Sequence, residues 1–390
     1  MKKTLIITFI ISFLAAKTAG QKLKIYSDFP SGNISVERIS NDTIWMHPDL
    51  RDTEGDWFYW CFAVKQAKGK SLTFVFTKPN VFTAMGQAIS KDQGSTWHWI
   101  NGEIEYSEAF SFTFDTDDDV RFSMGMPYVQ KDFDNFIKPF LESDYVTLNS
   151  LTKTKTGKEI ERLFIKPPND NVKYKVLITA RHHACEMMAN YEIEGLVKEI
   201  LNDNWLKNNV EFCFIPFIDK DGVENGDQGK NRKPHDQNRD YGERSIYGST
   251  KALKEWVPQW AENKLAIAMD LHCPWIKGDY HENILVVGTE NERIAEQQKL
   301  FCKILKSTNK GELKVSNKIY MPFGIDWNTS ASYTAGVSFK TWASTLEGVK
   351  LPISFEFPYG TNEGQIITQQ NARDFGADLA IAIKKYLKQL

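Results

Sequence analysis

Residues 176–186 read VLITARHHACE, an apolar strand-like run followed at once by side chains that can bind a metal ion. His183 and Glu186 stand three positions apart, between this run and a helix-like segment that starts near Ala189. A strand-to-helix corner can point both side chains into one crevice, and in open α/β sheets sites form at the carboxyl ends of strands. The stretch therefore predicts an α/β fold with a site at the end of this strand.

A third candidate ligand closes a second apolar strand. Residues 265–272 read LAIAMDLH, which puts His272 at the end of that run. Catalytic zinc sites take about three protein ligands, drawn from imidazole and carboxylate, and leave one position for water. An H-x-x-E pair alone is common and also occurs as plain surface polarity. Together with His272, however, His183 and Glu186 are candidates to bind one zinc ion.

Other polar residues follow the apolar run at 210–216 or interrupt a late apolar strand. Those after the run at 210–216 are Arg232, Asp236, Asn238 and Arg239. Near the C-terminus, residues 353–357 read ISFEF and place Glu356 among apolar neighbours. A buried ionised carboxylate is costly unless it is paired or used in chemistry. These residues extend the metal candidates into a candidate catalytic set.

In this order the set resembles the zinc carboxypeptidase family, in particular its cytosolic-carboxypeptidase-like branch, over roughly residues 138–390. The resemblance implies that His183, Glu186 and His272 are the zinc ligands. It also implies that Arg232 polarises the scissile carbonyl and that Glu356 is the general base.

The same resemblance assigns residues to the substrate. Asn238 and Arg239 match the pair that holds the terminal carboxylate of the peptide. Asp236 matches the carboxylate partner of the first zinc histidine, and Tyr333 is a looser match to the family's mobile tyrosine.

The chemistry of these residue types agrees with those roles. Zinc lowers the pKa of bound water from about 15.7 to roughly 7, and a carboxylate such as Glu356 can take the remaining proton and pass it to the leaving amine. The planar fork of arginine suits Arg239 to a carboxylate and Arg232 to a developing oxyanion. Asp236 would fix the tautomer of His183 by accepting its other ring proton.

The expected function is therefore hydrolysis of the last peptide bond of a peptide that presents a free C-terminal carboxylate. Two alternatives remain open at this point. One is a zinc-dependent amidase that deacylates small N-acyl amino acids, and the other is a non-catalytic protein that binds peptides or glycans on the same fold.

The resemblance also indicates which segment contacts the side chain of the substrate's last residue. The resemblance places the floor of the side-chain pocket within residues 337–345, with Thr341 as a candidate; this stretch holds no acidic residue, while Lys340 could favour an acidic side chain.

Cys185 and Cys273 flank the expected metal ligands and are interpreted as small buried hydrophobes. Alternation along the strand end should point His182 away from the metal.

The composition is that of an ordinary globular protein. The chain has 390 residues, 42% of them hydrophobic and 25% charged, and a net charge of −2, which gives no sign of a nucleic-acid partner. Lys2 and Lys3 precede an apolar run over residues 4–16, and residues 1–20 are predicted to be a secretory signal. The run is too short to anchor the protein in a membrane. We therefore predict a bacterial protein of the periplasm or the extracellular medium.

Two domains are expected after the signal. Residues 21–135 contain short aromatic-rich alternating runs separated by turn signals, which is typical of an all-β sandwich. In residues 136–390, apolar strands alternate with helical patterns, and this order predicts a mostly parallel, mixed α/β sheet. Five scattered cysteines show no disulfide spacing.

Overall fold

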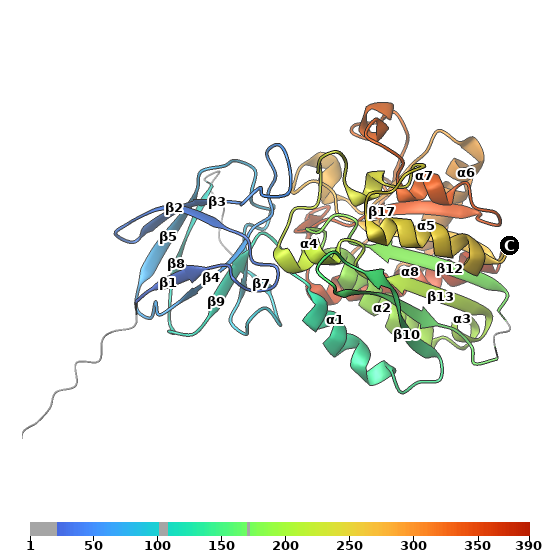
Figure 1. The fold of residues 1–390 in the computed structure, drawn as a ribbon, viewed down its shortest axis with the longest axis horizontal. Coiled ribbons are helices and arrows are strands. Elements are labelled where there is room, and N and C mark those ends of the chain that lie inside the picture. Colours follow the sequence, from blue (N-terminus) through green and yellow to red (C-terminus); the bar gives the residue numbers. More distant parts are fainter. Residues whose placement is uncertain (1–21, 101–107, 170–171) are drawn as a thin grey trace, which may run out of the picture.

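The computed structural model describes residues 22–100, 108–169 and 172–390 (Figure 1). The predicted secretory signal, residues 1–20, lies outside the described residues, and the predicted location of the protein stays a prediction. In the described ranges, none of the helices is both long and apolar enough to cross a membrane.

The N-terminal part of the chain folds as two β-sheets that face each other, drawn in blue and cyan in Figure 1. One sheet has the order β1-β4-β9-β6-β7, formed by Lys24–Tyr26, Cys61–Lys65, Val120–Ser123, Ala88–Ser90 and His98–Trp99. The other has the order β2-β3-β5-β8, formed by Ser35–Ser40, Thr43–His47, Ser71–Phe76 and Ala109–Thr113. Aromatic rings meet between the sheets: the ring centroids of Phe62 and Phe74 are 5.1 Å apart, and those of Phe110 and Phe122 are 5.3 Å apart. The aromatic residues of the alternating runs thus form the core of this β-rich region.

The C-terminal part is built on one sheet of order β10-β11-β13-β12-β14-β17-β15-β16. In that order the strands are Val146–Lys153, Glu159–Ile165, Val210–Ile215, Tyr174–Ala180, Leu265–His272, Leu351–Glu356, Leu285–Val287 and Tyr320–Met321. The central strands β13, β12, β14 and β17 run parallel, whereas β10, β11 and the pairing of β15 with β17 are antiparallel. The sheet is therefore mixed with a parallel centre, which confirms the predicted fold class.

Helices cover both faces of this sheet. The α-helices of the described chain are α1 (Gln130–Ile137), α2 (Met188–Asn202), α3 (Asn204–Asn209), α4 (Lys220–Asn225), α5 (Gly248–Ala261), α6 (Glu292–Thr308), α7 (Phe339–Ala343) and α8 (Gln369–Leu387), of which α2, α6 and α8 share one buried cluster and α5 and α7 the other. Successive side chains of a strand point to opposite faces. In β12, Ile178 accordingly lies in the same buried cluster as Leu196 of α2, while Leu177 lies in the other buried cluster, with Leu253 of α5. The strand is buried on both sides, which explains its unbroken apolar run.

The elements that carry the predicted site agree with the sequence patterns to within a few residues. Helix α5 was not expected, because Gly248 opens it and Pro258 lies inside it, and both residues weaken a helical pattern. The parallel centre of the sheet then sets the place of the site. Ala180 of β12 pairs with Leu271 of β14, and His272 pairs with Glu356 of β17, so the carboxyl ends of three neighbouring strands meet at one edge.

Candidate active site

The chain leaves β12 through one residue with a left-handed backbone. Arg181 has a φ of 61°, a conformation that costs a non-glycine residue about 1–3 kcal/mol and gathers at functional sites. Its buried guanidinium donates hydrogen bonds to the carbonyl oxygens of Ala184 and Tyr128 and to Oδ1 of Asn190. These contacts hold residues 182–186 in a fixed loop at the edge of the sheet.

The segment after α4 packs against the same loop. Gly229 has a φ of 81°, and a Cβ atom on it would lie 2.1 Å from the backbone nitrogen of Ala184. Only glycine fits so close an approach. The amide of Cys185 also donates to the carbonyl of Gln228, at 3.2 Å. The two loops therefore position each other.

The loop and the end of β14 bring the three predicted metal ligands together. Nδ1 of His183 lies 2.8 Å from one carboxylate oxygen of Glu186, and Nδ1 of His272 lies 2.8 Å from the other. All three donor atoms lie within 4.8 Å of one another. Two imidazoles and one carboxylate in a partly open pocket are the donor set of a catalytic zinc ion, so the residues present fit this metal.

The ring nitrogens that face away from Glu186 meet two aspartates. Nε2 of His183 lies 3.6 Å from Oδ1 of Asp236, as the sequence predicted for this pair. Nε2 of His272 hydrogen-bonds to Asp270, which stands two residues earlier on β14 and therefore on the same face of the strand. When Nδ1 binds a metal, Nε2 carries the proton and can donate it to such a carboxylate, which fixes the tautomer.

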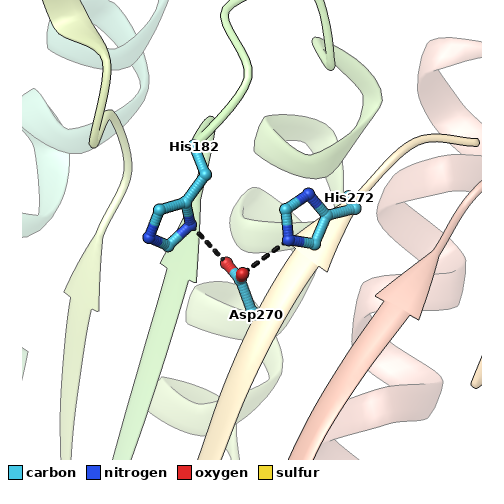
Figure 2. A group of neighbouring side chains, drawn as sticks. All are labelled: His182, Asp270 and His272. Carbon is cyan, nitrogen blue, oxygen red and sulfur yellow. Dashed lines mark hydrogen bonds and ion pairs between the residues drawn. The ribbon is translucent and has the colours of Figure 1, made fainter. Parts of the chain in front are cut away.

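Asp270 links the metal site to a further buried histidine. Figure 2 shows its carboxylate between the rings of His182 and His272. Oδ1 of Asp270 lies 2.8 Å from Nδ1 of His182, whose Nε2 lies 2.7 Å from the hydroxyl of Tyr241. The donor atoms of His182, Asp270 and His272 also lie within 4.8 Å of one another, but His182 and Asp270 are fully buried and do not line the pocket that contains His183 and Glu186. We interpret the group as a positioning chain behind His272. His182 lies beyond the end of β12, where alternation along a strand no longer applies, and its two ring nitrogens contact Asp270 and Tyr241.

Neighbouring positive groups lower the pKa of both Glu186 and Asp270. Burial would raise the pKa of Glu186, but His183, Lys230 and His272 hold it well below the usual value. Burial would likewise raise the pKa of Asp270, but His182 and His272 lower it. Both groups are therefore anions that pair with imidazoles, as a metal site requires.

The three metal-facing side chains lie in a pocket of about 620 Å³. Glu356, at the end of β17, lines the same pocket. Burial raises the pKa of Glu356, and the neighbouring Glu186 adds to that effect while His272 opposes it. Trp57 of the N-terminal β-rich region also lines the pocket, with its ring centroid 5.1 Å from that of Trp275. The pocket thus brings Glu356 together with the three candidate metal ligands, and the N-terminal region forms part of its wall.

The residues predicted to hold the substrate carboxylate lie in this pocket too. Nη2 of Arg239 donates to the carbonyl of Ser332 at 2.8 Å, and Arg239 lies 5.4 Å from the ring centroid of Tyr333. The hydroxyl of Tyr333 donates to Asn328. Asn238 lies 3.2 Å from Nε2 of His272. The structure therefore gathers Asn238, Arg239 and Tyr333 beside the metal donors.

Arg232 does not lie where the sequence predicted. It is outside the pocket lining, and its guanidinium is held by Asp52 at 3.0 Å, Asp219 at 2.6 Å and Asp227 at 3.0 Å. Three carboxylates hold this fork away from the metal donors, so it cannot polarise a carbonyl there. One of them, Asp52, comes from the N-terminal region, which no local pattern around Arg232 could reveal.

Lys230, which no sequence motif marks, lies in the pocket instead. Nζ of Lys230 is 2.8 Å from an oxygen of Glu186 and donates to the carbonyl of Cys273 at 2.9 Å. Burial would lower the pKa of Lys230, but Glu186 raises it above the usual value, so the side chain stays a cation. Its only signal in the sequence is its place in the glycine-rich segment between Gly226 and Arg232.

The predicted specificity segment also differs in detail. Thr341 is exposed and its hydroxyl hydrogen-bonds to Ser338, whereas Ser338 and Lys340 line the pocket. Ser338 caps helix α7, and Lys340 is buried on this helix together with Phe339 and Ala343 of the core. Cys185 and Cys273 are fully buried and free of disulfides, and burial raises the pKa of both thiols, in agreement with their interpretation as small buried residues.

Comparison with known proteins agrees with this geometry. Residues 135–263 match the sequence model of the zinc carboxypeptidase family Peptidase_M14. This segment contains His183 and Glu186 and ends before His272 and Glu356, which the fold itself adds to the site. No curated protein sequence matches the chain.

Several solved structures share the fold. A metallo-carboxypeptidase from Burkholderia cenocepacia is 18% identical, with a TM-score of 0.75 over 94% of this chain and 99% of that one. A metallo-carboxypeptidase from Pseudomonas aeruginosa, in complex with (2-guanidinoethylmercapto)succinic acid, is 16% identical, with a TM-score of 0.74 over 94% and 99% of the two chains. Carboxypeptidase A from Helicoverpa armigera is 17% identical, with a TM-score of 0.51 over 67% and 73%. The first two cover the N-terminal β-rich region as well as the α/β part.

Proposed function

Because the chain contains a zinc carboxypeptidase domain of the Peptidase_M14 family, we propose that it is a metallocarboxypeptidase that removes the C-terminal residue of peptides. The observation that carries the proposal is the convergence of three groups in one pocket: the donor set of His183, Glu186 and His272, the half-buried acid Glu356, and the cation Arg239.

Each of these groups has a defined task in that reaction. A zinc ion bound by the donor set would supply Lewis acidity and lower the pKa of bound water to about 7. Glu356 accepts a proton from the attacking water and delivers it to the leaving amine. Arg239 offers its fork to the terminal carboxylate of the peptide and so places the last peptide bond next to the reacting groups.

A peptidase assay with control of the metal tests the proposal. We expect the purified protein to bind one zinc ion and to shorten peptides by single residues from the C-terminus, which mass spectrometry reads directly. Chelation should abolish the cleavage and added zinc should restore it, while a peptide amidated at its C-terminus should resist. Release of acyl groups from N-acyl amino acids without peptide cleavage would favour the amidase alternative, and a protein without stoichiometric zinc would favour the binding-protein alternative.

We also propose that the pocket prefers an acidic C-terminal side chain. Lys340 is 6% exposed, and its Nζ donates to the carbonyl oxygens of Val287 and Gly288 at 2.8 and 2.9 Å. In the described part of the chain, no carboxylate hydrogen-bonds to it. Burial lowers the pKa of Lys340 to about 7, because the ammonium lacks a close counter-ion. A substrate carboxylate would supply that counter-ion.

Substitution of Lys340 tests this preference. Lys340→Met should lower kcat/KM for a peptide ending in Glu by about tenfold or more, the scale of one hydrogen bond to a charged group, and leave the peptide ending in Gln nearly unchanged. The wild-type advantage of Glu over Gln should also fall as the pH rises above about 7, because the lysine loses its charge there. The exposed Lys350→Met variant serves as the control. Equal losses for both peptides would assign Lys340 to the fold and not to specificity.

A further inference from the structure

The proposed reaction needs a cation beside the scissile carbonyl, and Arg232 does not provide one. When water adds to a peptide carbonyl, the π electron pair moves onto the carbonyl oxygen, and donors aimed at that oxygen stabilise the transition state. The guanidinium of Arg232 is neutralised by three aspartates outside the pocket. The donor has to be sought among the cations that line the pocket.

Lys230 is the lining lysine that reaches the metal donors. Its Nζ is 2.8 Å from Glu186, whereas Nζ of Lys340 is bound to the carbonyl oxygens of Val287 and Gly288. Arg239 is directed to the carbonyl of Ser332, near Tyr333. Proximity to Glu186 therefore separates Lys230 from the other two cations.

The surroundings of Lys230 fix its position and leave it a donor to spare. The side chain is 14% exposed. It follows Gly229, whose backbone packs against Ala184. The loop of residues 182–186 therefore fixes the backbone from which the Lys230 side chain extends. An ammonium has three donors. In the described structure Glu186 and the carbonyl of Cys273 take two of them, and the third can be offered to a ligand in the pocket.

We propose that Lys230 is the residue that polarises the scissile carbonyl, in the place the sequence assigned to Arg232. As the water oxygen bonds to the carbonyl carbon, Lys230 donates a hydrogen bond to the carbonyl oxygen and keeps its own proton. The carbon–nitrogen bond then breaks, and the amine leaves with the proton that Glu356 passes to it. This assignment rests on the proposed carboxypeptidase function.

The test compares Lys230→Met and Lys230→Arg with the wild type, each loaded with zinc and with its zinc content measured. Lys230→Met should keep one zinc ion and a KM within a few-fold of the wild type, and should lose about a hundredfold in kcat, the scale of one missing oxyanion donor. Lys230→Arg should recover part of that loss, since it restores the charge. Lys233→Met, a change at a neighbouring lysine that is 65% exposed, should have no effect.

A binding measurement distinguishes stabilisation of the carbonyl oxygen by Lys230 from a purely structural role of this side chain. A phosphonate peptide, which carries anionic oxygens on a tetrahedral centre, should bind Lys230→Met about a hundredfold more weakly in calorimetry. The released product amino acid should bind both proteins alike. Unchanged kcat and phosphonate affinity would overturn the assignment, and so would a loss of zinc from Lys230→Met, because the lysine would then only support Glu186. A wild type that cleaves no peptide would overturn the proposed function first, and a phosphonate that still loses affinity would show that Lys230 binds the anion all the same.

Discussion

Replacing Glu356 by glutamine is expected to lower turnover of peptide substrates by about 10²–10⁴-fold, the usual contribution of a general base, while the protein keeps its zinc. Glutamine matches the shape of the side chain but cannot accept the proton of water. Glu356 ends a strand whose neighbour in register is the candidate metal ligand His272, so the sheet itself holds the carboxylate beside the proposed reacting groups. Turnover at saturating substrate and metal analysis of the same preparation check this expectation.

Glu347→Gln is a suitable control, since Glu347 is exposed and precedes the same strand. It should leave both turnover and zinc content unchanged. A Glu356→Gln protein that is folded, carries zinc and turns over substrate at the wild-type rate would remove Glu356 from the mechanism. Loss of zinc in that variant would instead mean that Glu356 is a ligand, which its place on β17 beside the donor set does not suggest.

The parts of the site that sit on strand ends were predictable from the sequence. Apolar runs marked β12, β14 and β17, and parallel pairing of neighbouring strands brings their carboxyl ends to one edge. This is why His183, His272 and Glu356 come together although 173 positions separate the first from the last. Asp270 was predictable by the same logic, because two residues of separation on a strand mean one face. The apolar run in which Asp270 stands hides this signal.

The parts on loops were not predictable in this way. Between β13 and α5 the chain has no hydrophobic period, so the side chain that enters the pocket depends on turns and on distant partners. Arg232 is drawn outward by Asp52, about 180 positions away in sequence, while Gly229 brings Lys230 inward. Thr341 and Lys340 differ for a similar reason: the rotation of the short helix α7 is set by which of its residues reach the core.

The same outward contact makes Arg232 important for stability. Arg232→Met is expected to lower the free energy of unfolding by about 3–5 kcal/mol, the cost of removing one partner from a buried charge cluster. The side chain is 12% exposed, and it neutralises Asp52, Asp219 and Asp227 together. Without it, the carboxylate of Asp52 from the N-terminal region would face those of Asp219 and Asp227 with no cation between them. Urea unfolding followed by tryptophan fluorescence measures the change, with the exposed Arg244→Met as control.

The loss of stability in Arg232→Met should depend on pH, and the aspartates around Arg232 set the direction of that dependence. Burial and the neighbouring Asp52 raise the pKa of Asp227 to about 7 even with Arg232 present. A carboxyl whose pKa is raised in the folded protein stabilises it at low pH, and that stability is lost as the pH rises through the folded value. Removing Arg232 raises the pKa of Asp227 further, so the destabilisation should be larger at pH 8 than at pH 5.5, and adding Asp52→Asn should recover part of it. An equal loss at both pH values would mean that Arg232 acts through packing of its side chain and not as the counter-ion of the three aspartates.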